Sequence, residues 1–154
     1  MEFKIISKMK HVWFQVPRVQ CKGKCQDSCS NVPVAPVEAE YLQQEYRVTF
    51  PILEHGLEMG IPPAEFHTLG PNNTPCMFLK DGRCSIYRNR PLICRAYGHD
   101  IAFLRCGWGC DEGKFNNRRL GSLLLQLFQL STTLPKYHNF ITNMKENYQK
   151  SKQV

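Results

Sequence analysis

The sequence lacks any long hydrophobic stretch, and this absence limits the kinds of protein it can encode. No apolar run approaches the roughly 20 residues that a membrane span needs. Charged residues interrupt the first ten positions, so no signal-peptide core is present there. We therefore expect a protein without membrane association, located in the cytoplasm, where thiols stay reduced and disulfides are uncommon. The sequence leaves the oligomeric state open.

Motifs for catalysis by side chains are also absent. The chain has no nucleophile elbow, Walker loop, dinucleotide fingerprint or HExxH helix. Its five histidines form no H-x3-H pair, and His99, between two cysteines, is the best candidate for a substitute ligand. Enzyme activity therefore stays undecided, because a redox enzyme would have to work through a bound cluster.

Cysteine, in contrast, is abundant and clustered. The eight cysteines fall into an N-terminal run, a central stretch and a closing pair. Thiolates are soft ligands that select zinc, copper(I) or iron–sulfur clusters. A reducing compartment and the clustering favour metal binding over disulfides or buried free thiols. The candidate metal ligands are Cys21, Cys25, Cys29, Cys76, Cys84, Cys94, Cys106 and Cys110.

The spacing of these cysteines bears on the type of metal. Structural zinc sites often use C-x2-C knuckles, whereas the close cysteines here have three residues between them. A [4Fe–4S] cluster takes four thiolates from varied spacings and loops. The sequence thus slightly favours a [4Fe–4S] cluster over zinc, and the thiols suffice for two centres. Arg90 and Arg95 are candidate cofactor-binding residues that would bond to sulfur or offset thiolate charge, the alternative being surface salt bridges.

Charge is distributed unevenly along the chain. The net charge of +7 divides into +5 over residues 1–24, −4 over 25–113 and +6 over 114–154. A basic excess favours nucleic acid or an acidic protein surface as partner, although it also keeps a protein soluble. Few aromatic residues accompany these charges, which weakens the case for base stacking. The residues that would contact nucleic acid are Lys4, Lys8, Lys10, Arg18, Lys22, Lys24, Arg118 and Arg119.

The length of 154 residues suits one domain, which buries about 70% of its unfolded surface. We expect an α+β fold, in which a small cysteine-rich, metal-stabilised domain has a short hairpin, irregular loops and several helices, including a C-terminal helical pair. Within the single domain 1–154, residues 18–110 would form the cysteine-rich metal-binding core and 114–154 a basic helical tail.

Local patterns predict most of the elements. Residues 2–6 and 11–16 alternate as short strands do, and the composition of the first cysteine run favours a wrapping loop. Helices are expected from Pro36 or Val37 to Arg47 and, in a shorter form, around 52–59. Apolar residues at helical spacing predict the two tail helices, over about 120–130 and 136–148, with Pro135 between them.

The centre of the chain predicts a hairpin followed by a short helix. Asp81-Gly82 is a strong turn signal. A two-residue turn would pair Lys80 with Arg83 and place Cys76 and Cys84 on opposite faces, so a centre shared by both thiols favours a longer, bulged turn.

The short helix that follows would be capped by Asn89, would carry Pro91, Cys94 and Arg95, and would end at Gly98.

The central cysteine block resembles a known family. Cys76-Met-Phe-Leu, Cys84-Ser-Ile-Tyr and Arg90-Pro-Leu-Ile-Cys94-Arg95 are similar to the "C-x-F-L … C-x-I-Y … R-P-x-x-C-R" block of the CxxCxxCC (YkgJ-like) family of zinc- or iron-chelating proteins. The resemblance covers roughly residues 18–110. The first cysteine run departs from the family, because it reads C-x3-C-x3-C and has Ser30 in place of the doubled cysteine. The resemblance implies metal binding.

These observations lead to one predicted function and two alternatives. The prediction is a cytosolic metal-binding protein that holds a [4Fe–4S] cluster or zinc through thiolates, with the metal mainly structural or redox. One alternative is a zinc-stabilised module that binds nucleic acid or transcription machinery. The other is a cluster-dependent redox or modifying enzyme.

Overall fold

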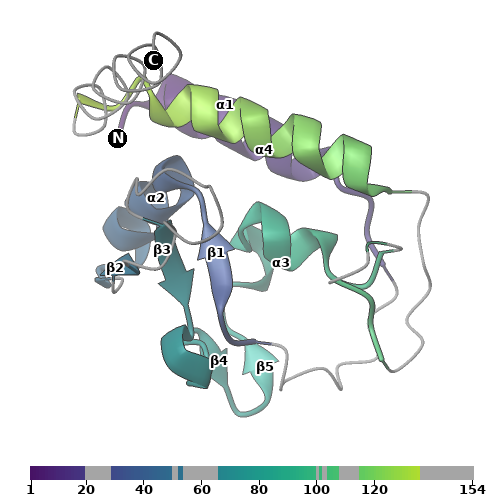
Figure 1. The fold of residues 1–154 in the computed structure, drawn as a ribbon. Helices are drawn as coiled ribbons and strands as arrows, with labels where there is room; N and C mark the ends of the chain where they lie inside the picture. Colours follow the sequence, from purple (N-terminus) through teal and green to yellow (C-terminus); the bar gives the residue numbers. More distant parts are fainter. Residues whose placement is uncertain are drawn as a thin grey trace, which may run out of the picture.

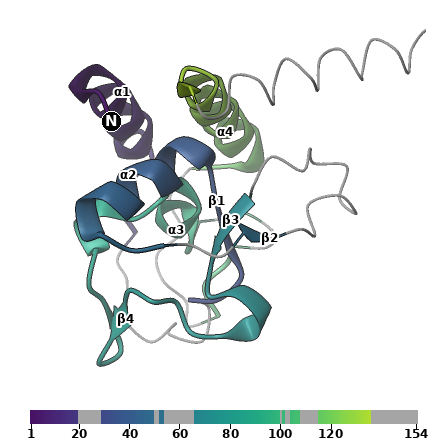
Figure 2. The ribbon, with the colours of Figure 1, turned by 90° about the vertical axis from the view of Figure 1, so that its left-hand side faces the viewer.

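The computed structural model describes residues 1–19, 29–49, 52–53, 66–99, 101, 104–107 and 115–135. Within these residues, four α-helices combine with two small antiparallel sheets, which confirms the α+β class (Figure 1). No helix in the described ranges is long and apolar enough to cross a membrane. The first and last of these helices lie side by side against the rest of the fold (Figure 2).

Helix α1 (Phe3–Phe14) occupies the region where the sequence predicted two short strands, and that prediction was wrong. Met9, Val12 and Trp13 are buried, and Ile5 is half-buried. These residues recur three or four positions apart, which places them on one face of a helix. The alternation seen in windows of five or six residues is too short to exclude this longer period.

Helix α2 (Pro36–Tyr46) confirms the predicted helix. Its first residue is proline, whose fixed φ suits the first turn of a helix and whose missing N–H costs nothing there. Arg47 ends it in the left-handed conformation, with a φ of 53°.

Helix α4 (Asn117–Ser131) is the predicted leucine-rich helix. The Asn116 side chain accepts a hydrogen bond from the Arg119 N–H and caps its start. Ser131 Oγ accepts a hydrogen bond from the Val37 N–H at 3.0 Å, which fastens α4 to the start of α2. The tail helix predicted over about 136–148 lies outside the described residues.

A three-stranded antiparallel sheet contacts α2. Its order is β1 (Val32–Val34), β3 (Phe66–Leu69), β2 (Ile52–Leu53), with β3 central. The helix predicted around 52–59 is therefore wrong at its first two residues, because Ile52 and Leu53 pair with β3. Pairing with a neighbouring strand overrides the local preference of so short a segment. Residues 54–59 lie outside the described residues.

The second sheet is the predicted hairpin, made of β4 (Leu79–Lys80) and β5 (Arg83–Cys84). Lys80 pairs with Arg83, so the turn has two residues and no bulge. Asp81 and Gly82 have φ values of 47° and 72°, which is the positive-φ turn that matches the twist of a hairpin. Each strand has only two residues, and this determines where the neighbouring thiols lie.

Candidate metal centre

Four of the described cysteines surround the β4–β5 hairpin. The Cys76 N–H donates to the Cys29 carbonyl at 2.7 Å, and Cys84 pairs with Leu79 in the hairpin. Burial is the main cause that raises the pKa of the Cys76 and Cys94 thiols. Repulsion from neighbouring thiols adds to it, from Cys84 and Cys29 at Cys76, and from Cys76 and Cys84 at Cys94. Cys76 therefore lies within electrostatic reach of Cys29, Cys84 and Cys94, and Cys84 within reach of Cys94.

The two-residue turn does not separate Cys76 from Cys84, so our inference from strand alternation was wrong. Side chains alternate only along paired strands, and β4 begins at Leu79, beyond Cys76. Cys76 lies in a preceding turn, in which the Leu79 N–H donates to the Cys76 carbonyl at 2.9 Å. This turn brings the thiol back toward the hairpin without a longer loop.

Two of the sulfurs accept a hydrogen bond from the backbone N–H of the residue two positions further along the chain. The Phe78 N–H lies 3.4 Å from Cys76 Sγ, and the Ile86 N–H bonds to the Cys84 thiol. Phe78 and Ile86 are both at least 95% buried, since their exposed fractions are 5% and 4%. Hydrogen bonds to sulfur favour the thiolate, which is the form that binds metal. Residues 76–78 and 84–86 therefore form two C-x-hydrophobic units. In each unit the third residue is buried in the core and holds in place the N–H that faces the sulfur.

Cys94 comes from helix α3 (Leu92–Ala96). Burial strongly raises the pKa of this thiol, and Arg90 acts in the opposite direction. A buried thiol stays neutral unless a positive charge stabilises its thiolate. A metal cation would supply that charge, and its binding would release the proton.

Arg90 and Arg95 play different parts around this centre. The Arg90 guanidinium lies 3.8 Å from the centre of the Tyr87 ring, and it lowers the pKa of both Cys84 and Cys94. Arg95 donates from Nε to the Arg90 carbonyl at 2.7 Å and lies over the Trp13 ring, 5.2 Å from its centre. Burial, with Arg90 nearby, lowers the pKa of Arg95 to about 10. Arg90 therefore acts on two thiols, while Arg95, which also interacts with Cys94, braces α3 against α1.

Glu38 is the residue that the sequence analysis missed. Its exposed fraction is 1%, and its carboxyl accepts hydrogen bonds from Trp13 Nε1 at 2.5 Å, Leu92 N at 2.7 Å and Ala35 N at 2.9 Å. Despite these donors, burial raises the pKa of Glu38. Glu38 joins α1, α2 and α3 and so fixes the helix that carries Cys94. The signal in the sequence was its position in the first turn of the predicted α2.

The cap predicted for α3 was consequently wrong. Asn89, at the end of the 3₁₀ turn η4 (Tyr87–Asn89), donates from Nδ2 to the Tyr46 hydroxyl at 2.8 Å instead. The Leu92 N–H at the start of α3 donates to Glu38. The predicted end of the helix fits, because Gly98 follows with a φ of 97°.

Gly70 positions the Cys29 backbone. It has a φ of 60°, and a Cβ placed on it would meet Ser30 Cα at 2.8 Å and the Thr74 carbonyl. The Asn31 N–H donates to the Gly70 carbonyl at 2.7 Å, just before the 3₁₀ turn η3 (Pro71–Asn73). The close approach of Cys29–Ser30 to this corner therefore requires a glycine.

The described thiols do not complete a ligand set by themselves. Cys21, Cys25 and Cys110 lie outside the described residues, as does all of the predicted wrapping loop before Cys29. Cys106 is half-buried. Within the described ranges, no three Cys, His, Asp or Glu side chains are grouped closely enough to hold a metal ion.

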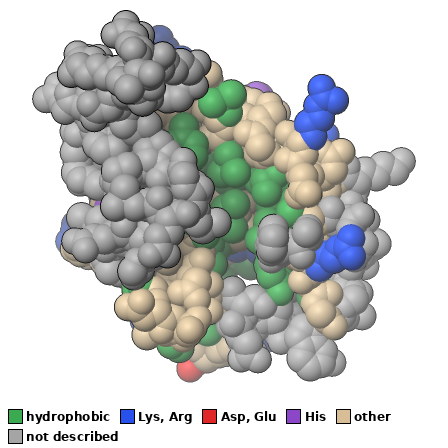
Figure 3. Space-filling view, in the orientation of Figure 1, with side chains coloured by type: hydrophobic (Ala, Val, Ile, Leu, Met, Phe, Trp, Pro, Cys, Tyr) green, Lys and Arg blue, Asp and Glu red, His purple; other side chains and the backbone are tan. Residues whose placement is uncertain are grey.

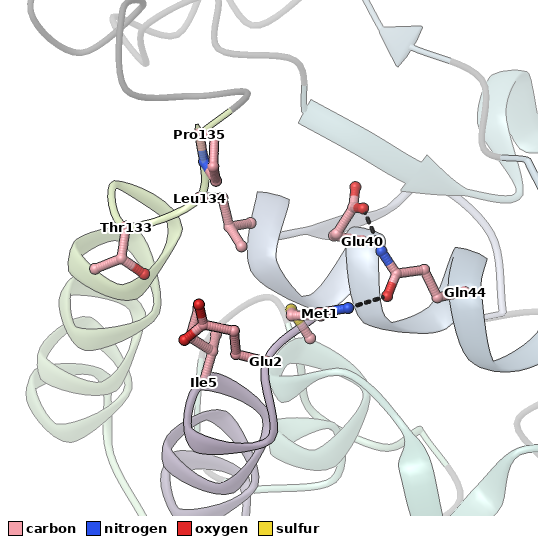
Figure 4. Close-up of a pocket in the computed structure, with 8 residues that line it drawn as sticks. All are labelled: Met1, Glu2, Ile5, Glu40, Gln44, Thr133, Leu134 and Pro135. Carbon is pink, nitrogen blue, oxygen red and sulfur yellow. Dashed lines mark hydrogen bonds between the residues drawn. The ribbon is translucent and has the colours of Figure 1, made fainter.

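A cavity of about 540 Å³ lies elsewhere, between the start of α1, helix α2 and the end of α4 (Figure 4). The Met1 amino group donates to Gln44 Oε1 at 2.6 Å along its wall, and Gln44 Nε2 donates to Glu40 Oε1 at 2.5 Å. No cysteine lines this cavity, so it is separate from the thiols: its lining residues are Met1, Glu2, Ile5, Glu40, Gln44, Thr133, Leu134 and Pro135.

Comparison with known protein families shows to which family the chain belongs. The family model CxxCxxCC, described as "Putative zinc- or iron-chelating domain", matches residues 20–120. The chain belongs to the CxxCxxCC family. The matched segment contains all eight cysteines and ends in the first turn of α4, so α1 and most of α4 lie outside it. No curated protein and no solved structure matches the chain. Membership of the CxxCxxCC family indicates a domain that chelates zinc or iron.

Proposed function

We propose that this CxxCxxCC protein binds a [4Fe–4S] cluster or zinc through its cysteines, among them Cys29, Cys76, Cys84 and Cys94. The observation that carries the proposal is the repeated C-x-hydrophobic unit. In both units a backbone N–H faces the sulfur, and both sulfurs lie within reach of Cys94. The other four cysteines are assigned as metal ligands because of the family match and their clustering in the sequence; they are Cys21, Cys25, Cys106 and Cys110.

The donor set fits either metal. Zinc and iron–sulfur clusters both accept four thiolates. The absence of C-x2-C knuckles supports the cluster, and a reducing compartment such as the cytoplasm would keep the thiols available. When bound, a [4Fe–4S] cluster would supply one-electron redox chemistry, whereas zinc would only stabilise the fold.

The residues around the thiols would act in the same way with either metal. The Phe78 and Ile86 N–H groups stabilise the thiolates, and Arg90 offsets their charge. Glu38 and Arg95 hold the helix that carries Cys94. Bound metal would therefore join the backbone at Cys29 to the hairpin and α3, which lie about fifty residues or more further along the chain.

The test is metal and acid-labile sulfide analysis of the protein purified without oxygen, together with its visible absorption spectrum. Iron and sulfide in equal amounts with broad absorption support the cluster, and zinc without sulfide supports the zinc form. Cys84→Ser and Cys94→Ser should lower the metal content, while Ser85→Ala, beside Cys84 and exposed, should leave it unchanged. A fully reduced chain that takes up neither metal would refute the proposal.

A second candidate function, binding to nucleic acid, is favoured by the pairing of α1 with α4. The two helices contact each other, and residues from the start of α1 and the end of α4 line one cavity, so the helices run in opposite directions. Exposed basic residues on both, Lys8 on α1 and Arg118 and Arg119 on α4, therefore belong to neighbouring elements. Lys10 is less available, because its ammonium lies 5.0 Å from the centre of the Tyr41 ring.

The space-filling view in Figure 3 shows hydrophobic side chains at the middle of one face and Lys and Arg side chains at its edge. If the helical pair binds phosphates, reversing Lys8, Arg118 and Arg119 to glutamate should abolish binding to short duplex DNA or RNA. Each lost phosphate contact should reduce the log–log salt slope by about 0.9 on duplex DNA. Lys80→Glu, an exposed change on the hairpin, is the matched control. Equal binding by the triple variant and the control would exclude this surface.

A further inference from the structure

His99 carries a buried ring nitrogen that no described group satisfies. The side chain is fully buried, and Nε2 lies 2.9 Å from the Pro17 carbonyl oxygen. A carbonyl oxygen can only accept, so Nε2 carries the proton and Nδ1 of the neutral ring carries a lone pair. Nδ1 is buried and has no hydrogen-bond partner among the described residues. Buried polar atoms almost always have partners, so this nitrogen requires an explanation.

The hydrogen bond of the His99 ring is of the kind that metal-binding histidines make. A metal-binding histidine nearly always donates its other ring N–H to a carboxylate, a backbone carbonyl or water, which fixes the tautomer and the ring orientation. The Pro17 carbonyl does this for His99 and leaves Nδ1 as the donor atom. The Phe115 ring packs against the imidazole, with 5.2 Å between ring centres, and helps to fix its position.

The backbone around His99 brings together two stretches that lead to thiols. Gly98, with a φ of 97°, lies so close to Val19 that an added Cβ would stand 3.1 Å from Val19 Cγ2. The Gly98 N–H also donates to the Leu104 carbonyl at 2.6 Å, which closes a short loop. Cys21 follows Val19 by two residues and Cys106 follows Leu104 by two. The chain therefore enters both cysteine segments from the neighbourhood of His99.

We propose that Nδ1 of His99 is a metal ligand, which adds one imidazole to the thiolates of the chain. This inference rests on the proposed metal-binding function. The histidine would also replace a ligand that the first cysteine run lacks, since that run has Ser30 in place of the family's doubled cysteine. Zinc accepts mixed cysteine and histidine ligand sets, and histidine also ligates iron in some iron–sulfur centres.

The test follows the histidine nitrogens of the reduced, full-length protein labelled with ¹⁵N-histidine while zinc alone is added. We expect the Nδ1 resonance of His99 to shift as zinc is taken up, and its Nε2–H signal to persist. His67, which is also buried, with an exposed fraction of 2%, is the internal reference and should not shift. An unchanged Nδ1 resonance in the zinc-loaded protein would overturn the inference. Equal shifts of His67 and His99 would also overturn it, because they would report a general rearrangement.

A variant provides a second measurement. His99→Gln places an amide N–H near the position of Nε2 and can keep the bond to Pro17, but it has no atom in place of Nδ1. We expect its zinc affinity to fall by more than about 10-fold, the lower limit for loss of even an outer-shell partner. Unchanged affinity would count against ligation, and the resonance experiment remains decisive if the variant folds poorly. Failure of the chain to bind zinc or iron at all would refute the proposed function, whereas metal binding without the His99 shift would refute only this inference.

Discussion

Replacing Glu38 tests whether one buried carboxyl group holds α3, the helix that carries Cys94, in place. Glu38→Gln keeps an oxygen that can accept from Trp13 Nε1 and Leu92 N, but it turns an amide NH₂ toward the Ala35 N–H. One buried donor then lacks an acceptor, which costs about 1–3 kcal/mol. Glu38→Ala leaves all three donors unsatisfied while relieving the burial of a carboxylate, and we expect a net loss of about 3–5 kcal/mol. Domains of this kind are stable by only about 5–15 kcal/mol.

The assay is urea unfolding followed by far-ultraviolet circular dichroism, with every variant at the same metal content. Glu40→Gln is the matched control, since it lies in the same helix, is only half-buried and bonds to Gln44. The control should change the free energy of unfolding by no more than about 0.5 kcal/mol. An unfolding midpoint of Glu38→Gln equal to that of Glu40→Gln would show that Glu38 does not support the fold as described.

The pH dependence of the same variant gives an independent check. Burial raises the pKa of Glu38 above its ordinary value of 4.5, so the folded state holds this proton more tightly than the unfolded state. Its contribution to stability is therefore fully present below 4.5 and is lost as the pH rises through the raised pKa. The stability advantage of the wild type over Glu38→Gln should widen as the pH falls from 7 toward 4.5. An advantage that narrows over this range would contradict the direction of the shift.

Three further predictions concern the metal centre. Gly70→Ala should weaken metal binding about tenfold without changing a ligand, because a left-handed residue with a Cβ costs about 1–2 kcal/mol; Gly121→Ala, where a Cβ meets nothing within 4 Å, should bind metal normally in the same titration. Chelation should speed amide hydrogen exchange around the β4–β5 hairpin while α4 stays protected, and uniform protection would show that the metal does not order the hairpin. Cys84→Ser and Cys94→Ser should each reduce metal content more than Cys106→Ser does, as measured by elemental analysis, because they lie on the rigid hairpin and α3.

The parts of the fold that the sequence predicted correctly are those with strong local signals. Pro36 marks the start of α2, the leucine repeat gives α4, and Asp81-Gly82 gives the hairpin. The prediction for α1 was wrong because windows of five or six residues do not separate the two-residue period of a strand from the period of about 3.6 residues of a helix. Strand β2 was missed because its two residues form a strand only by pairing with β3.

The candidate site was predicted unevenly for a similar reason. The cysteines and Arg90 could be chosen as candidates from the sequence because their residue types and spacing indicate metal-binding chemistry. Glu38 was not, because its three donors come from residues as far away as Leu92, and only packing brings them to one carboxyl group. The reach of Cys76 to Cys84 also depended on strand lengths that the sequence did not specify.

The pairing of α1 with α4 has a consequence for how the chain gains its order. All eight cysteines lie between the end of α1 and the start of α4, so the contact between these helices closes a loop of about one hundred residues. Closing a long loop costs conformational entropy, and a metal that cross-links segments inside the loop shortens the free chain that must be closed. Metal uptake and the docking of the two helices should therefore favour each other, although the helices contribute no thiol. The contact between α1 and α4 thus closes the loop from its two ends, and metal bound inside the loop would determine how much free chain that contact has to order.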